Sequence, residues 1–172
     1  MTKEKQSISA NEDEISLYTY TGEAIWKIQV VEQALSFWIT LKLNPNANIA
    51  QADIFLKELQ SFTLGKAIKT AKQNRLFNKS LQAIMNPFLI ERNWLIHKSL
   101  SEIQQELDYY NKRKEIINDL CKRIKSISDT ALIIQREIEY DMIRFCESQN
   151  RDISKIREII KLQESGKRIY KY

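Results

Sequence analysis

The stretch IINDLCKRIKSISDTALIIQREIEYDMIRF, residues 116–145, decides the fold. Its apolar residues recur at intervals of three and four, and neither glycine nor proline interrupts it. This spacing predicts one amphipathic helix of about 30 residues, roughly 45 Å long. A helix of that length either spans a whole bundle or reaches a second subunit. Its predicted buried positions are Ile116, Leu120, Ile124, Ile127, Ala131, Ile134, Ile138, Met142 and Phe145.

The composition of the whole chain supports the same fold class. Only three glycines and two prolines occur in 172 residues, and a sheet protein of this length needs many more turns than these can supply. We therefore expect an all-α bundle of about five or six helices, formed by one domain over residues 21–164. Residues 1–20 are expected to be a flexible N-terminal arm and residues 165–172 a basic C-terminal tail.

Further helices are predicted on both sides of the long stretch. A first helix covers residues 21–43, and the loop NPNAN at 44–48 follows, because proline cannot continue a helix and asparagine tolerates turns. A second helix starts near Ile49, a short basic helix covers residues 64–73, and a last helix covers residues 150–162. The expected buried positions are Ile25, Ile28, Val31, Leu35, Trp38 and Leu41 in the first helix, and Ile54, Leu56, Leu59 and Phe62 beside the second.

Residues 78–100 form the densest apolar stretch and are expected to supply the central helix. Pro87 lies within this stretch, and proline is well tolerated in the first turn of a helix. We therefore favour a helix that begins at Asn86 and Pro87. At about 100° per residue, the centre of its apolar stripe is formed by Leu89, Ile96 and Leu100.

Basic residues are concentrated in one segment of the chain. The net charge is +5, and no acidic residue occurs between Glu58 and Glu91. Such a segment is a candidate surface for contact with phosphates, although an ordinary solvated helix face explains it equally well. The basic residues of this segment are Lys66, Lys69, Lys72, Arg75 and Lys79.

The sequence lacks the usual signs of secretion, membrane insertion and metal binding. The N-terminus has no apolar signal-peptide core, and the longest apolar runs are far shorter than the roughly 20 residues that span a bilayer. Cys121 and Cys146 form no disulfide framework, and with a single histidine they match no zinc spacing. We expect a cytoplasmic protein with no metal, no cofactor and no membrane contact.

His97 is the only histidine, in the local sequence ERNWLIHK at residues 91–98. Histidine is the usual general acid or base near neutral pH, so this neighbourhood is the candidate site. Asn93 lies one helical turn before His97, and both lie at one edge of the apolar stripe, whereas Arg92 lies at the other edge, about 140° from His97 around the helix. A second copy of the helix across a two-fold axis would help the arginine and the histidine meet at one phosphate.

The motif Arg92-Asn93, three residues, His97 resembles the signature of the HEPN superfamily. The arrangement of residues 63–66, TLGK, at the head of a short helix, followed by this motif, is also similar to bacterial members. The resemblance covers about residues 21–146 in helix order, and only the motif is specific. It implies an up-and-down helical core of the HEPN type.

The same resemblance implies a metal-independent endoribonuclease that acts as a homodimer, as a toxin or as an antiviral defence effector. His97 would be the general acid/base for attack by the ribose 2′-hydroxyl, and Arg92 would stabilise the phosphorane-like transition state. Asn93 would orient His97 or the phosphate. An antitoxin or another defence protein is an expected partner. The residues expected to bind RNA are Lys66, Lys69, Lys72 and Lys98.

Residue chemistry without the resemblance leaves a structural alternative open. Arg92, Asn93 and His97 could be satisfied polar residues in a non-catalytic helical module that binds a nucleotide or a partner protein. Trp94 is expected to point away from the apolar stripe, together with Glu91. Packing in the core or in a dimer is the simpler role for this tryptophan, and stacking on a base is the other.

Overall fold

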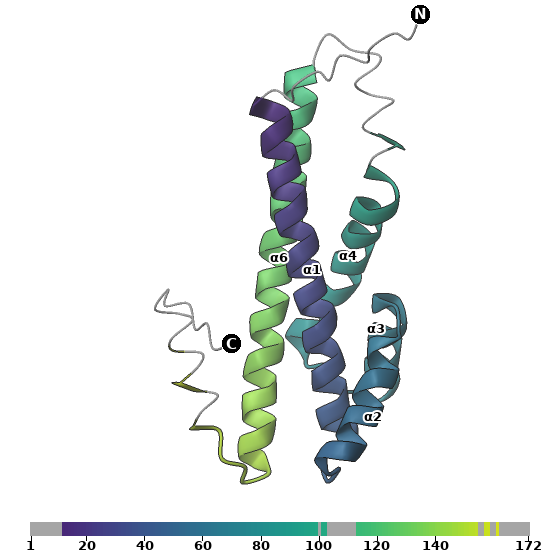
Figure 1. The fold of residues 1–172 in the computed structure, drawn as a ribbon, viewed down its shortest axis with the longest axis vertical. Coiled ribbons are helices and arrows are strands. Elements are labelled where there is room, and N and C mark those ends of the chain that lie inside the picture. The colour runs from purple at the N-terminus through teal and green to yellow at the C-terminus, as the bar shows by residue number, and fades with distance from the viewer. Residues whose placement is uncertain (1–11, 100, 103–112, 155–156, 159–160, 162–172) are drawn as a thin grey trace, which may run out of the picture. The chain divides into compact units, whose positions relative to one another are not determined.

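The computed structural model describes residues 12–99, 101–102, 113–154, 157–158 and 161. These residues form helices and no strand, so the expected all-α fold class is confirmed for the described part of the chain (Figure 1). The helices are α1 (Glu12–Leu43), α2 (Ile49–Gln60), α3 (Leu64–Gln73), α4 (Lys79–His97) and α6 (Arg113–Ser148).

Several helix boundaries agree with the sequence pattern. Helix α2 begins at Ile49 as expected, behind a capping box in which Asn48 and Gln51 bind each other's backbone N–H groups. Helix α3 has the predicted bounds, and α6 contains the whole of residues 116–145. The C-terminal tail, residues 165–172, lies outside the described residues.

The expectation of a flexible arm over residues 1–20 is wrong for residues 12–20, which form the start of α1. The acidic residues of this segment lie in the first helical turn, where negative charge interacts favourably with the helix dipole. Residues 1–11 are outside the described part.

The expected helix start at Asn86 and Pro87 is also wrong, because α4 continues through Pro87. The helix begins instead at Lys79, where the side chain of Asn78 accepts a hydrogen bond from the Leu81 N–H at 2.8 Å. Proline removes a backbone donor and disfavours the interior of a helix. Burial of the helix face on both sides of Pro87 offsets that cost, since Met85 and Phe88 are 0 % and 2 % exposed.

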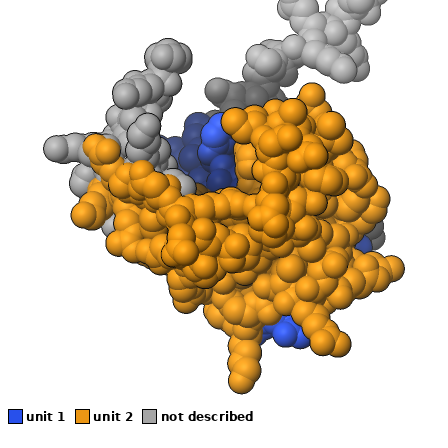
Figure 2. Space-filling view, turned by 90° about the horizontal axis from the view of Figure 1, so that it is seen from below, with its two compact units in different colours: residues 1–32, 82–134 blue, residues 33–81, 135–172 orange. Residues whose placement is uncertain are grey.

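The described chain divides into two compact units, and α1, α4 and α6 contribute residues to both (Figure 2). Unit 1 comprises residues 1–32 and 82–134, and unit 2 comprises residues 33–81 and 135–172. The single domain expected over residues 21–164 stays a prediction. No described helix is long and apolar enough to cross a lipid bilayer.

Unit 1 is a three-helix packing in which α4 runs opposite to the adjacent parts of α1 and α6 (Figure 1). The periodic apolar residues of all three helices meet in its core. Burial of one valine, leucine, isoleucine, phenylalanine or methionine side chain contributes about 1.5–3 kcal/mol to stability. A polar contact joins Ser128 of α6 to Glu23 of α1 at 3.4 Å. The core residues include Ile28 and Val31 of α1, Met85, Phe88 and Leu95 of α4, and Ile124, Ile127, Ala131 and Ile134 of α6.

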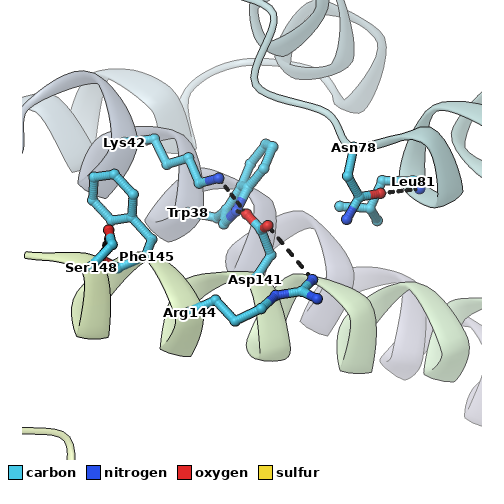
Figure 3. A network of polar contacts seen from close by, with 8 residues as sticks. All are labelled: Trp38, Lys42, Asn78, Leu81, Asp141, Arg144, Phe145 and Ser148. Carbon is cyan, nitrogen blue, oxygen red and sulfur yellow. Dashed lines mark hydrogen bonds and ion pairs between the residues drawn. The ribbon is translucent and has the colours of Figure 1, made fainter.

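In unit 2, α1 and α6 are joined by a polar network around Asp141 (Figure 3). The fully buried Trp38 donates its indole N–H to Asp141 at 2.7 Å, and Lys42 forms an ion pair with the same carboxylate. The ammonium group of Lys42 also lies 5.1 Å from the Trp38 ring centroid and 5.4 Å from that of Phe145. Trp38 therefore has its N–H satisfied inside the apolar core of this unit.

Helix α2 buries less of its surface than the sequence indicates. Leu59 is buried as expected, but Ile54 is 67 % exposed, so its assignment to the core is wrong. The main apolar contribution of this region comes from α3, whose buried residues are Leu64, Ala67, Ile68 and Ala71.

Two helices end in the same hydrogen-bonding pattern, with a non-glycine residue in the left-handed region. Arg75 after α3 and Asn150 after α6 each have φ of 54°. At α3 the N–H groups of Arg75 and Leu76 donate to carbonyls of the last helical turn at 3.0 Å, which is the Schellman arrangement. Asparagine tolerates this conformation because its short polar side chain can bond to nearby backbone, whereas the arginine side chain does not offset the steric cost in this way.

Candidate functional site

The orientation of α4 determines which residues of the candidate site are exposed. The buried stripe of α4 differs from the expected one. Its buried residues Leu81, Met85, Phe88 and Leu95 continue the spacing of four and three through position 92. Arg92 therefore lies on the core-facing stripe. Ile96, expected at the centre of the stripe, is 40 % exposed, so that assignment is wrong. Isoleucine and leucine occur on both faces of this helix, and periodicity alone does not identify the packed one.

Arg92 is turned toward α1 and is largely buried, with a side chain 21 % exposed. Its Nη2 donates to Glu32 at 2.9 Å, and its Nη1 donates to the amide oxygen of the adjacent Asn93 at 3.3 Å. The Nε atom is buried and has no hydrogen-bond partner among the described residues. The guanidinium is thus held by one carboxylate with part of its donor capacity unused.

His97 is the last residue of α4, and its side chain is exposed. Within the described ranges we find no hydrogen bond or ion pair that fixes its imidazole. The ring is therefore available to a substrate or to a second protein.

Asn93 and His97 belong to one exposed stripe of α4 that carries no formal charge. Its residues are spaced by three and four, so they share one helix face. The structure thus brings Asn93 and His97 together on this face, one turn apart, and directs Arg92 to another face. The stripe consists of Ala83, Asn86, Ile90, Asn93 and His97.

Trp94 does not point away from the core as expected, since it is only 7 % exposed. The Arg123 guanidinium of α6 lies 3.4 Å from its ring centroid and binds both carboxylate oxygens of Glu91, at 2.8 and 3.1 Å. The Trp94 indole N–H donates to Glu102. Core packing, the simpler of the two roles considered for Trp94, is therefore observed. Sequence reasoning missed Arg123, because its partner is 32 residues away and no local pattern links the two.

The lysines expected to bind RNA lie in different units. Lys98 of unit 1 is exposed. In unit 2, Lys66 and Lys69 are exposed and Lys72 is half-buried. The Lys66 ammonium group lies 3.5 Å from the centroid of the Phe62 ring, a cation–π contact. RNA binding by these lysines stays a prediction.

The structure also bears on metal binding and on the two cysteines. No cluster of three or more metal-binding side chains occurs in the part of the chain that the structure describes. Both cysteines are free thiols. Burial, with a smaller effect of Asp13, raises the pKa of the Cys121 thiol and keeps it protonated. Cys121 is therefore a poor nucleophile.

Comparison with known proteins adds no relative. No family model matches the chain, and neither the search of curated proteins nor that of solved structures yields a match. The resemblance to the HEPN superfamily therefore rests on the Arg92, Asn93 and His97 motif and on its helical context.

Proposed function

We propose that the protein is a metal-independent endoribonuclease of the HEPN type, acting in the cytoplasm as a toxin or an antiviral defence effector. The observation that carries this proposal is the position of Asn93 one turn before the exposed His97, on a face of α4 without lysine, arginine, aspartate or glutamate. A general acid/base must reach its substrate, and His97 is accessible. Arg92 directly precedes Asn93 and contacts its side chain.

The proposed reaction needs no metal ion. His97 accepts the proton of a ribose 2′-hydroxyl, the 2′-oxygen bonds to the adjacent phosphorus, and the bond from phosphorus to the 5′-oxygen breaks. The 5′-oxygen takes up a proton from water as it leaves, and His97 returns its proton to water. The products are a 2′,3′-cyclic phosphate and a 5′-hydroxyl. Arg92 would stabilise the additional negative charge of the transition state, and Asn93 would orient His97 or the phosphate. DNA lacks the attacking hydroxyl and should remain intact.

A homodimer is part of the proposal. Arg92 and His97 lie on different faces of α4, so a second copy of the helix would bring the arginine of one chain and the histidine of the other to one phosphate. The exposed stripe of α4 supports this arrangement because it contains no lysine, arginine, aspartate or glutamate and has a large aliphatic residue, Ile90, at its centre. An antitoxin or defence partner could cover the same stripe when the enzyme is restrained.

A non-catalytic helical module that binds a nucleotide or a partner protein is the second candidate. The ion pair between Arg92 and Glu32 favours it, because this contact gives Arg92 a structural role within unit 1. In that case His97 would be an ordinary exposed residue.

Expression in bacteria distinguishes the two candidates. The enzyme should arrest growth and cleave RNA in the presence of a chelator, and His97→Ala should do neither. Gln82→Ala is a matched control, since Gln82 is another exposed residue of α4. Equal toxicity of the wild type and His97→Ala, or intact RNA with both, favours the non-catalytic module.

A further inference from the structure

Two arginines of unit 1 bind carboxylates in different ways. Arg123 uses Nε and Nη2 together, and both oxygens of Glu91 accept from it, at 2.8 and 3.1 Å. Arg92 binds Glu32 through Nη2 at 2.9 Å, while its Nε is buried without a partner among the described residues. Nε and Nη2 donate from the same edge of a guanidinium and form a fork that matches two oxygens of one anion. The fork of Arg92 is therefore half filled.

A half-filled fork makes the observed contact of Arg92 weaker than the geometry of its side chain allows. A buried donor without an acceptor loses its hydrogen bonds to water and gains nothing in return. An RNA phosphodiester presents two non-bridging oxygens, which suit the same edge of the guanidinium. The Glu32 carboxylate and a phosphate cannot both occupy that edge.

We propose that Glu32 is an intramolecular competitor of RNA for Arg92. This inference rests on the proposed function. In the free protein Glu32 holds the guanidinium against α1, and a bound phosphodiester displaces the carboxylate and completes the fork. Both side chains retain access to solvent, with 21 % of Arg92 and 32 % of Glu32 exposed. A phosphodiester can therefore approach the contact between Arg92 and Glu32 from solvent.

The position of Arg92 explains why its charge needs an acidic partner in the free protein. The residue lies on the core-facing stripe of α4, between Phe88 and Leu95, so its side chain leaves the backbone toward the protein interior. An acidic residue on the facing helix compensates this charge when no RNA is present. The same compensation lowers the affinity for RNA by the free energy of the contact that must be broken.

The test measures binding of a 2′-O-methyl RNA oligonucleotide, which lacks a free 2′-hydroxyl and cannot be cleaved by the proposed reaction. Glu32→Gln should bind it about fivefold more tightly than the wild type, a factor that corresponds to about 1 kcal/mol. It should also cleave unmodified RNA faster at concentrations below saturation. Glu91→Gln is the matched control. It removes one negative charge at the position next to Arg92 in the sequence, but the Glu91 carboxylate binds Arg123 and not Arg92. Its affinity should stay within about twofold of the wild type.

A double-mutant cycle tests whether the gain in RNA affinity depends on Arg92. Glu32→Gln should not strengthen binding in the Arg92→Met background, where the long apolar side chain fills the same space. Glu32→Ala is a second variant that frees Arg92. A gain that persists without Arg92, or the absence of any gain in both Glu32 variants, overturns the competitor role.

The two proposals fail in different ways. If the wild type cleaves RNA and neither Glu32 variant binds more tightly, only the competitor role of Glu32 is refuted. If the wild type, the Glu32 variants and Glu91→Gln all leave RNA intact and unbound, the ribonuclease proposal falls and the competitor role falls with it.

Discussion

Replacing Asp141 by alanine should destabilise the protein far more than removing a typical surface carboxylate. The side chain of Asp141 is 14 % exposed, accepts a 2.7 Å hydrogen bond from the fully buried Trp38 and pairs with Lys42, itself 17 % exposed. The alanine variant leaves the indole N–H without an acceptor, at about 1–3 kcal/mol. It also leaves a largely buried ammonium group without its partner, although the flexible Lys42 side chain can move toward water. We expect a total loss of about 2–4 kcal/mol.

Equilibrium unfolding in urea measures this loss. With a slope of about 2 kcal/mol per molar urea, the midpoint should fall by roughly 1–2 M. Asp141→Asn retains an oxygen acceptor for the indole and should lie between the alanine variant and the wild type. Asp119→Ala is the control in the same helix, because the Asp119 and Lys122 side chains are both 76 % exposed, and it should change stability by less than about 0.5 kcal/mol. If Asp141→Ala is as stable as Asp119→Ala, the network of Figure 3 does not stabilise the fold as argued.

Three further changes have defined outcomes. Arg75→Gly should raise the free energy of unfolding by about 1 kcal/mol in urea titration, because glycine removes the steric cost at φ of 54°, and a decrease would contradict this account. In a Cys146→Ala background, Cys121 should react with iodoacetamide at pH 8 more slowly than glutathione, because burial raises its pKa and leaves less thiolate. Equal rates would refute the shift. Light scattering should give the wild type twice the 20.3 kDa of one chain and Ile90→Asp the mass of a single chain; a monomeric wild type would refute the dimer.

The helical fold could be predicted because its signals are local. Apolar spacing identified α6, and the loop of residues 44–48 separated α1 from α2. The structure adds that Asn48 and Thr63 cap the starts of α2 and α3. Tertiary packing determined what local signals could not. Helix α4 passes through Pro87 because one face of the helix is buried on both sides of it, at Met85 and Phe88.

The candidate site was predictable only in part. Asn93 lies one turn from His97 as expected, but Arg92, expected at the other edge of the apolar stripe, lies within the buried stripe itself. The partner of Arg92 could not be foreseen, because Glu32 is 60 residues away in the sequence. The contact between Trp94 and Arg123 could not be predicted from the sequence either, because Arg123 belongs to a different helix.

The most direct test of the proposed activity is to determine the ends of RNA fragments from cultures that express the wild type or His97→Ala. The proposed mechanism predicts new 5′-hydroxyl and 2′,3′-cyclic phosphate ends with the wild type and none with the variant. The same ends in both cultures, or wild-type fragments that carry 5′-phosphate and 3′-hydroxyl groups, would contradict catalysis by His97.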